Sequence, residues 1–175
     1  MIQRFLVLCF LVTLAFTGFA QPANDDCANA ITINTAPFGA TCTSPVAAST
    51  LNATASPNAP ACAGNQADDD IWYKFVSTAA NVVLRITDGS QIPTGATGFA
   101  FAIYQNDCPA NNTSFFCNSG FGFNNAHHII NGLTPGATVY IRFWGPGTTQ
   151  RIQFNFCIQD LPDTPANDNC NGAVS

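Results

Sequence analysis

The sequence predicts an antiparallel β-sandwich of about eight or nine short strands, and three observations support this all-β fold class. Gly, Pro and β-forming residues are abundant, whereas Glu is absent and Lys occurs once. Short segments of alternating apolar and polar residues follow one another along the chain. Tracts rich in Gly, Pro, Asn and Asp separate them, and no amphipathic helix stands out beyond residue 20.

The strongest strand candidate covers residues 71–76, which combine aromatic and β-branched side chains directly after a polar acidic tract. Residues 81–88 follow after a short break and alternate in the same way, so the two segments are expected to form a hairpin with one buried face. The other strand candidates are residues 29–34, 46–51, 98–105, 126–132, 137–145 and 151–159.

The alternation also predicts the core. The aromatic residues expected to meet between two sheets are Phe99, Phe101, Phe143, Phe154 and Phe156. A second group stands in Asn- and Gly-rich surroundings and is interpreted as loop plugs or partly exposed rings: Phe115, Phe116, Phe121 and Phe123.

Residues 1–20 are predicted to be a signal peptide, with Arg4 before an apolar run and small residues at Gly18 and Ala20. The run is shorter than the roughly 20 residues that a membrane-spanning helix needs, so we expect no membrane insertion after cleavage. Residues 21–161 would form the sandwich domain of a secreted or cell-surface protein. Residues 162–175 would be a linker and the truncated start of a second repeat, because "PANDDC" at 22–27 returns as "PANDNC" at 165–170.

Charge excludes some classes of partner. Beyond residue 20 the chain has ten Asp and four basic residues, Lys74, Arg85, Arg142 and Arg151, so its formal charge is 4 − 10 = −6. Nucleic acid and anionic lipid both require clustered Lys and Arg, and neither is an expected partner.

Seven cysteines follow the predicted signal peptide, and in an exported chain they are expected to form disulfides. No zinc-type spacing of Cys and His is present. Because seven is odd, Cys170 in the terminal repeat phrase is expected to be unpaired. Cys108 and Cys117 flank a short polar loop, and Cys42 and Cys62 bracket a Pro- and Ala-rich stretch, so each is predicted to be a local pair. Cys27 with Cys157 is the simplest completion.

An ordered set of motifs resembles a known family. The set begins with "PANDDCANAITI", continues through "DDDIWYKFVST", "FAFAIYQNDC" and "LTPGATVYIRFWG", and closes on "IQFNFCIQD". Together these are similar to the bacterial pre-peptidase C-terminal-type β-sandwich domain, which is repeated in large secreted and surface proteins, often of the type IX route. The resemblance covers residues 22–160. It implies a jelly-roll-like domain associated with attachment, substrate or carbohydrate binding and, in some relatives, calcium.

The acidic tract is a candidate metal site. Asp68, Asp69 and Asp70, with Asp25 from the start of the domain, offer the carboxylate oxygens that calcium prefers. No EF-hand spacing is present, and the alternative is an acidic loop that precedes a strand. No cofactor is required by the sequence, and calcium is the one candidate.

Tyr140, Arg142 and Trp144 share the polar side of one predicted strand, which makes this side the candidate ligand-binding face. The alternative is that these large side chains pack inside the protein. His127 and His128, as neighbours on a strand, point to opposite faces and cannot line one site. No nucleophile or metalloenzyme motif accompanies them, so this chain is not expected to be an enzyme.

The sequence therefore predicts a non-catalytic secreted or cell-surface module for adhesion, ligand binding or spacing within a larger protein. Its expected partners are an extracellular polysaccharide, protein or cell-surface ligand and the neighbouring repeats of the parent chain. Two alternatives stay open. One is an accessory domain of a secreted hydrolase whose catalytic domain lies beyond Ser175, binding carbohydrate or substrate. The other is a stand-alone lectin-like binder.

Overall fold

The computed structural model describes residues 20–64, 66–92, 98–109, 113–123 and 127–162. The predicted signal peptide, the repeat phrase at 165–170 and Cys170 lie outside the described residues. The elements, in chain order, are η1 (Cys27–Asn29), β1 (Ile31–Thr32), β2 (Thr35–Ala36), β3 (Val46–Ser49), η2 (Ala61–Ala63), β4 (Ile71–Val76), β5 (Asn81–Ile92), β6 (Phe99–Gln105), β7 (Phe116–Phe121), β8 (His127–Ile130), β9 (Thr138–Trp144) and β10 (Arg151–Leu161). No helix among these described elements is long and apolar enough to cross a bilayer.

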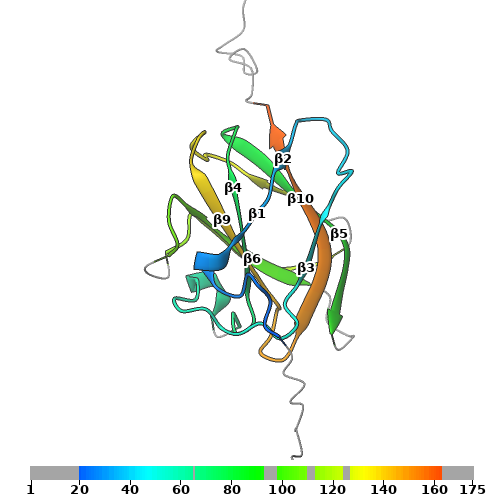
Figure 1. Cartoon of the computed structure of the whole chain (residues 1–175), viewed down its shortest axis with the longest axis vertical. Helices are drawn as coiled ribbons and strands as arrows, with labels where there is room; N and C mark the ends of the chain where they lie inside the picture. Colours follow the sequence, from blue (N-terminus) through cyan, green and yellow to red (C-terminus); the bar gives the residue numbers. More distant parts are fainter. Residues whose placement is uncertain (1–19, 65, 93–97, 110–112, 124–126, 163–175) are drawn as a thin grey trace, which may run out of the picture.

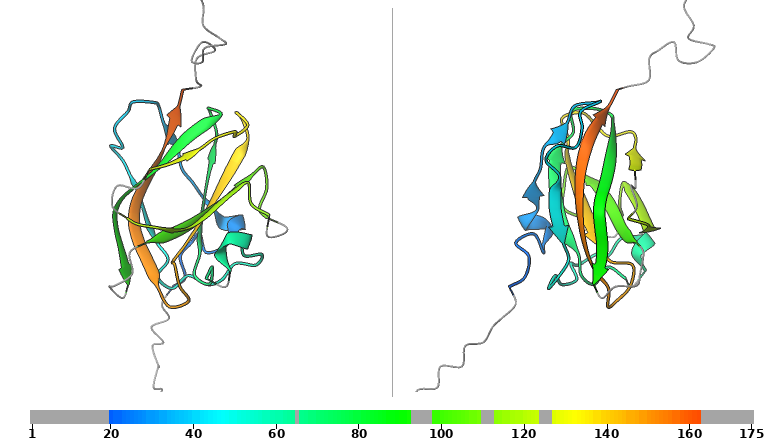
Figure 2. Two further views of the ribbon diagram at one scale, coloured as in Figure 1. Left: turned by 180° about the vertical axis from the view of Figure 1, so that it is seen from behind. Right: turned by 90° about the vertical axis from the view of Figure 1, so that its right-hand side faces the viewer.

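The strands form two sheets that pack face to face, which confirms the predicted sandwich (Figures 1 and 2). The first sheet has the order β1-β4-β9-β6-β7, and the second has the order β2-β10-β5-β8, with β3 also paired to β10. The main core lies between the sheets, because each strand sends alternate side chains to the inner face.

The predicted aromatic core is confirmed. Phe99, Phe101, Phe143 and Phe156 are fully buried, and Phe154 is 3% exposed. Rings from the two sheets meet directly, with the centroids of Phe143 and Phe156 5.1 Å apart. Each fully buried ring contributes on the order of 1.5–3 kcal/mol to the free energy of folding.

Two short strands depart from the antiparallel pattern. β1 runs parallel to β4 with Ile31 opposite Tyr73, and β2 runs parallel to β10 with Thr35 opposite Ile158. Residues 31–36 thus leave the edge of one sheet and join the edge of the other within a few residues. The sheets are therefore mixed at these edges because one extended segment passes between them.

The predicted hairpin between residues 71–76 and 81–88 is wrong. β4 pairs with β9 in the first sheet, whereas β5 pairs with β10 and β8 in the second. Residues 77–80 cross from one sheet to the other. Alternation did not distinguish the two arrangements, because strands of a hairpin and strands facing each other across a sandwich both present one apolar side to the core.

The strand β7, at the edge of the first sheet, was not predicted. Its sequence, "FCNSGF", lacks regular alternation and contains residues that disfavour strands. The ring of Phe116 stacks on Phe101 with centroids 5.5 Å apart, and Phe123 just beyond the strand is 8% exposed. Phe115, just before the strand, is 46% exposed, in agreement with its expected position outside the core.

All six described cysteines are bonded, but none of the three predicted pairs forms. The disulfides are Cys27–Cys108, Cys42–Cys157 and Cys62–Cys117. Each joins a residue from the first half of the chain to a partner at least 55 residues away. Cys42 and Cys62 do not pair with each other because they bond to different sheets: Cys42, in a loop, bonds to a residue of β10, and Cys62, in η2, to a residue of β7.

Candidate functional site

The predicted ligand face lies on the outer side of the first sheet, where two coil segments cover it. Ala30, Ala63 and Ala67 pack there with Trp72, Tyr104 and Trp144 in a second, smaller core, and Cys27, Ala59 and Cys62 pack against it. Arg142 and Trp144 are fully buried, and Tyr140 is half-buried. The candidate ligand-binding residues Tyr140, Arg142 and Trp144 therefore lie beneath these segments, which Cys27–Cys108 and Cys62–Cys117 tie across the sheet.

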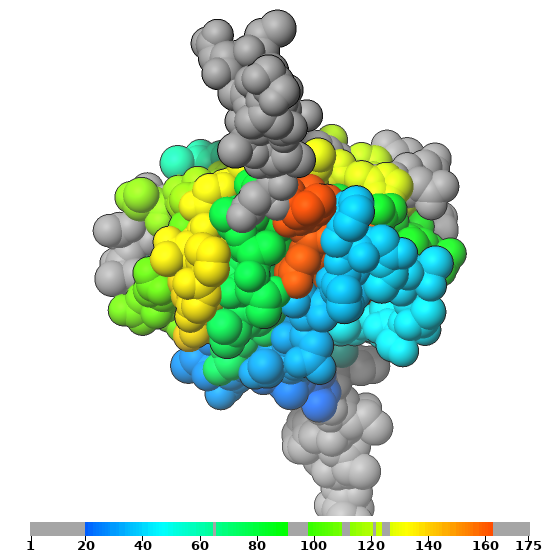
Figure 3. Space-filling model, turned by 90° about the horizontal axis from the view of Figure 1, so that it is seen from above, coloured from blue at the N-terminus to red at the C-terminus, as the bar shows by residue number. Residues whose placement is uncertain are grey.

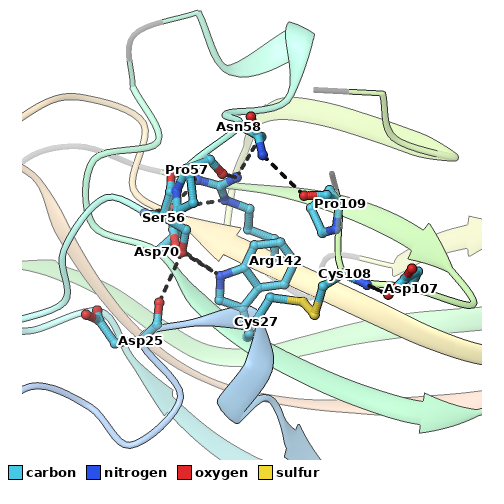
Figure 4. Close-up of a disulfide and its surroundings, with 11 residues drawn as sticks. Asp25, Cys27, Ser56, Pro57, Asn58, Asp70, Asp107, Cys108, Pro109 and Arg142 are labelled. Carbon is cyan, nitrogen blue, oxygen red and sulfur yellow. Dashed lines mark hydrogen bonds and ion pairs between the residues drawn. A yellow bond between two sulfur atoms is a disulfide. The ribbon is translucent and has the colours of Figure 1, made fainter. Parts of the chain in front are cut away.

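Arg142 is the centre of this covered face (Figure 4). Its guanidinium makes five hydrogen bonds. Two go to Asp70, one from Nε at 3.0 Å and one from Nη2. The other three reach the backbone carbonyls of Ser56, Pro57 and Asn58 at 3.0–3.3 Å. A guanidinium has five N–H donors, so the protein itself satisfies the whole group.

Trp72 and Asp70 complete the network. The Trp72 ring lies 5.1 Å from the Arg142 guanidinium carbon, and its indole N–H donates to Ser56 Oγ at 2.8 Å. Burial raises the pKa of the Asp70 carboxyl, and the charge of Arg142 opposes that rise. The arrangement is structural, because a ligand could reach Arg142 only after the covering coils had moved.

The opening motif of the domain has a structural role at the same face. The Asn24 amide donates to the Trp72 carbonyl at 2.9 Å, and the Trp72 N–H donates back to the Asn24 carbonyl at 2.8 Å. Asp25 accepts hydrogen bonds from the backbone N–H and the hydroxyl of Thr54, both at 2.7 Å. Together with Cys27, these residues fix the start of the chain onto the first sheet.

The acidic tract is divided among different partners. Asp69 is fully buried, accepts a hydrogen bond from Thr50 Oγ1 at 3.0 Å and lies 3.1 Å from Arg151 Nη1. Burial raises the pKa of the Asp69 carboxyl to about 8, against the opposing effect of Arg151. Asp68 is half-buried beside it.

The described residues contain no group of three or more His, Cys, Asp or Glu side chains placed to hold a metal ion. Asp25, Asp68, Asp69 and Asp70 therefore do not form one such group, and Asp25, Asp69 and Asp70 each have protein partners. A calcium site built with backbone carbonyls stays an untested prediction.

A groove of about 510 Å³ lies instead on the outer face of the second sheet. Val83, Arg85 and Thr87 of β5 and Gln159 of β10 form its floor, and the loop at residues 38–42 forms one wall. Phe38, on that loop, is 64% exposed. From above, the residues that follow β2 lie beside the C-terminal end of β10 (Figure 3). The volume suits a small ligand, since such sites usually measure about 300–1,000 Å³.

Three polar side chains are linked across the floor of this groove. Arg85 Nε donates to Gln159 Oε1, and Arg85 Nη1 lies 2.5 Å from Nε2 of the exposed His127. The strand register explains both contacts. Arg85 stands directly opposite His127 on β8 and opposite Cys157 on β10, and Gln159 lies two residues beyond Cys157 on the same face of β10.

The wall of the groove is fixed to its floor. Gln159 Nε2 donates to the carbonyl of Ala40, and Cys42 is bonded to Cys157. The predicted opposite orientation of the two histidines agrees with the structure, since His127 is exposed while the His128 ring lies 5.3 Å from that of Phe101. Sequence reasoning missed Phe38. The available indication was a lone aromatic residue in the turn sequence Pro37-Phe38-Gly39.

Comparisons with known proteins identify one family for this chain. A family model described as galactose binding domain-like, and associated with the type IX secretion system, matches residues 23–158. A search of solved structures finds the pre-peptidase C-terminal domain of a collagenase from Bacillus anthracis, with 13% identity and a TM-score of 0.40 over 74% of this chain and 93% of that one. No curated protein matches. The chain belongs to the galactose-binding-domain-like family associated with type IX secretion.

Proposed function

We propose that this chain is a non-catalytic extracellular module that binds carbohydrate at the groove beneath Phe38, on behalf of a larger protein. The observation that carries the proposal is the pairing of an exposed aromatic ring with a polar floor in one recess. Sugars present apolar C–H faces and a rim of hydroxyl groups, so they bind to sites that combine these two features.

Two further facts support this function. The family description names galactose binding, and three disulfides suit a chain that folds outside the cytosol. The disulfide Cys42–Cys157 also holds the wall of the groove in place before a ligand arrives, which lowers the entropic cost of binding. Adhesion is compatible with the same module, because a carbohydrate-binding domain attaches its parent protein to a surface. A module of this kind can also act as a spacer between other domains of the parent protein.

Binding can be tested with the full chain, exported into an oxidising compartment, on an array of neutral and acidic glycans. We expect binding that Phe38→Ala weakens by about tenfold, since the substitution removes the ring on which a sugar would pack. Phe115→Ala is the matched control, because Phe115 is also an exposed phenylalanine but lies outside the groove. No glycan binding, or equal losses in the two variants, would refute the proposal.

A role as accessory domain of a secreted hydrolase is the second candidate. It uses the same groove and differs only in what the parent protein carries. An assay of whether the complete parent protein cleaves the glycan bound by this groove distinguishes the accessory role from the attachment role. A parent that cleaves this glycan favours the accessory role, and one that does not favours attachment.

A further inference from the structure

We infer that the groove is specific for a saccharide bearing an isolated carboxylate, such as a uronic acid, with Arg85 as the residue that recognises the acid. This inference rests on the proposed function, because it names the ligand class of the same groove. It begins with the distribution of the few basic residues. Arg142 and Arg151 each contact a buried carboxyl group, that of Asp70 and that of Asp69. Within the described part of the chain, Arg85 forms no ion pair with a carboxylate.

The lack of a carboxylate partner among the described residues is unusual for an arginine in this position. It is half-buried on the floor of a groove in a chain whose acidic residues outnumber its basic ones. An arginine is always charged, and its planar fork matches a carboxylate with two parallel hydrogen bonds. The contacts with Gln159 and His127 use Nε and one Nη1 donor, so three of its five donors remain for a ligand.

The two side chains that are hydrogen-bonded to Arg85 place no negative charge beside it. Because a guanidinium cannot accept a hydrogen bond, Nε2 of His127 must accept, which leaves Nδ1–H as a donor. Gln159 is engaged at both ends, since its oxygen accepts from Arg85 and its nitrogen donates to Ala40. A carboxylate, which only accepts hydrogen bonds, therefore suits the unused donors of Arg85 and His127, while the hydroxyl groups of Thr41 and Thr87 can bind the hydroxyl groups of the sugar.

Asp160 is the one carboxylate among the described lining residues, and it does not cancel this charge. Successive residues of a strand point to opposite faces, so the Asp160 side chain points away from the face that carries Gln159. Its Oδ2 accepts a hydrogen bond from Thr78 Oγ1 at 2.5 Å.

The charge of the whole chain limits the ligand further. Its formal net charge of −5 repels densely charged polyanions at long range. A single arginine can bind one acidic group at short range, where the two parallel hydrogen bonds outweigh that repulsion. The ligand class is thus an oligosaccharide with isolated acidic units, and the exposed ring of Phe38 supplies packing against the sugar itself.

The test compares two ligands that differ only at C6. Methyl galactosiduronic acid carries one carboxylate where methyl galactoside carries a CH₂OH group, and both are titrated into the exported full chain by calorimetry at neutral pH. We expect the acid to bind at least about tenfold more tightly, the difference that one charge-assisted bidentate contact gives. Arg85→Gln should abolish this preference, because it weakens binding of the acid more than binding of the methyl galactoside, and Arg85→Lys should retain part of it.

The outcomes separate this inference from the proposed function. If both sugars bind equally and Arg85→Gln changes neither affinity, the acid specificity is refuted while carbohydrate binding in the groove stands. If neither sugar binds and the glycan array is also negative, the proposed function fails. Thermal unfolding of each variant shows whether it has folded. If Arg85→Gln does not fold, Arg85→Lys decides instead, because the lysine keeps the charge. An undiminished preference for the acid in a folded Arg85→Ala would also overturn the inference.

Discussion

The carboxylate of Asp70 and the guanidinium of Arg142 form an ion pair in which neither side chain has any exposed surface. The pair connects β9 to the acidic tract before β4, and the hydrogen bonds from Arg142 to residues 56–58 extend it to the covering coil. A charge removed from water in this way needs every one of its partners.

Breaking this pair should be costly. We expect Arg142→Met to lower the free energy of unfolding by about 3–5 kcal/mol, because it leaves the buried Asp70 charge and three carbonyls without their donor. Urea unfolding measures the loss. Lys74→Met is the control, since it removes a base from the same sheet outside the network. A loss below about 1 kcal/mol would show that the pair is unimportant.

Asp69 should make stability depend on pH. Its folded pKa of about 8 lies above the ordinary value of 3.8, so between these values the folded state keeps a proton that the unfolded state has lost. This group's contribution to stability is therefore complete below about pH 4 and is lost as pH rises through about 8. Asp69→Asn imitates the neutral form.

We expect the excess in melting temperature of Asp69→Asn over the native chain to grow steadily from pH 5 to pH 9. Thermal unfolding from pH 5 to 9 measures the difference between the two proteins, which cancels the other titrating groups. Asp88→Asn, at an exposed position of β5, is the control for the removal of one carboxylate. A difference for Asp69→Asn that does not change with pH would contradict the raised pKa.

The disulfide pattern can be read by mass spectrometry. Chymotrypsin cuts at Leu51, between Cys42 and Cys62, and at Phe115, between Cys108 and Cys117. Without reduction we expect linked peptides for Cys27–Cys108, Cys42–Cys157 and Cys62–Cys117. A linked peptide joining Cys108 to Cys117, or Cys42 to Cys62, would contradict the structure.

The disulfide Cys42–Cys157 should matter for binding as well as for stability. Replacing both residues by Ser is expected to cost about 2–4 kcal/mol of unfolding free energy. It should also weaken glycan binding by about tenfold, if the loop carrying Phe38 then occupies the binding position about a tenth of the time. Replacing Cys62 and Cys117 is the matched control, with a similar loss of stability and unchanged binding, since neither residue lines the groove. Equal binding by both variants would show that the loop needs no anchor.

The sequence predicted most strands and the aromatic core because alternation directly reports which side of a strand is buried. Residues 71–76 and 151–159 were placed nearly to the residue, and all five core phenylalanines lie where the pattern put them. Alternation failed at β7, which lies at a sheet edge and carries Asn, Ser and Gly. The family could also be predicted from sequence motifs, because Asn24, Asp25 and Cys27 lie close together in the sequence and together hold the start of the domain on the first sheet.

The candidate site was not accessible in this way. Tyr140, Arg142 and Trp144 occupy the side of β9 that faces away from the main core, as the pattern implied, but only the folded chain shows that the segments carrying Cys27 and Cys62 cover that side. The groove depends on Phe38, Arg85 and Gln159, which lie far apart in the sequence and meet because β5 pairs with β10.

The sequence by itself therefore determined the fold class, the core residues and the six cysteines that pair, because these depend on periodicity and composition within short segments. Tertiary structure alone decided which cysteines bond, which sheet each strand joins and which outer face stays open to a ligand. Those properties depend on contacts between residues distant along the chain. Local pattern carries no information about such contacts, since coil segments of similar composition can lie over either sheet.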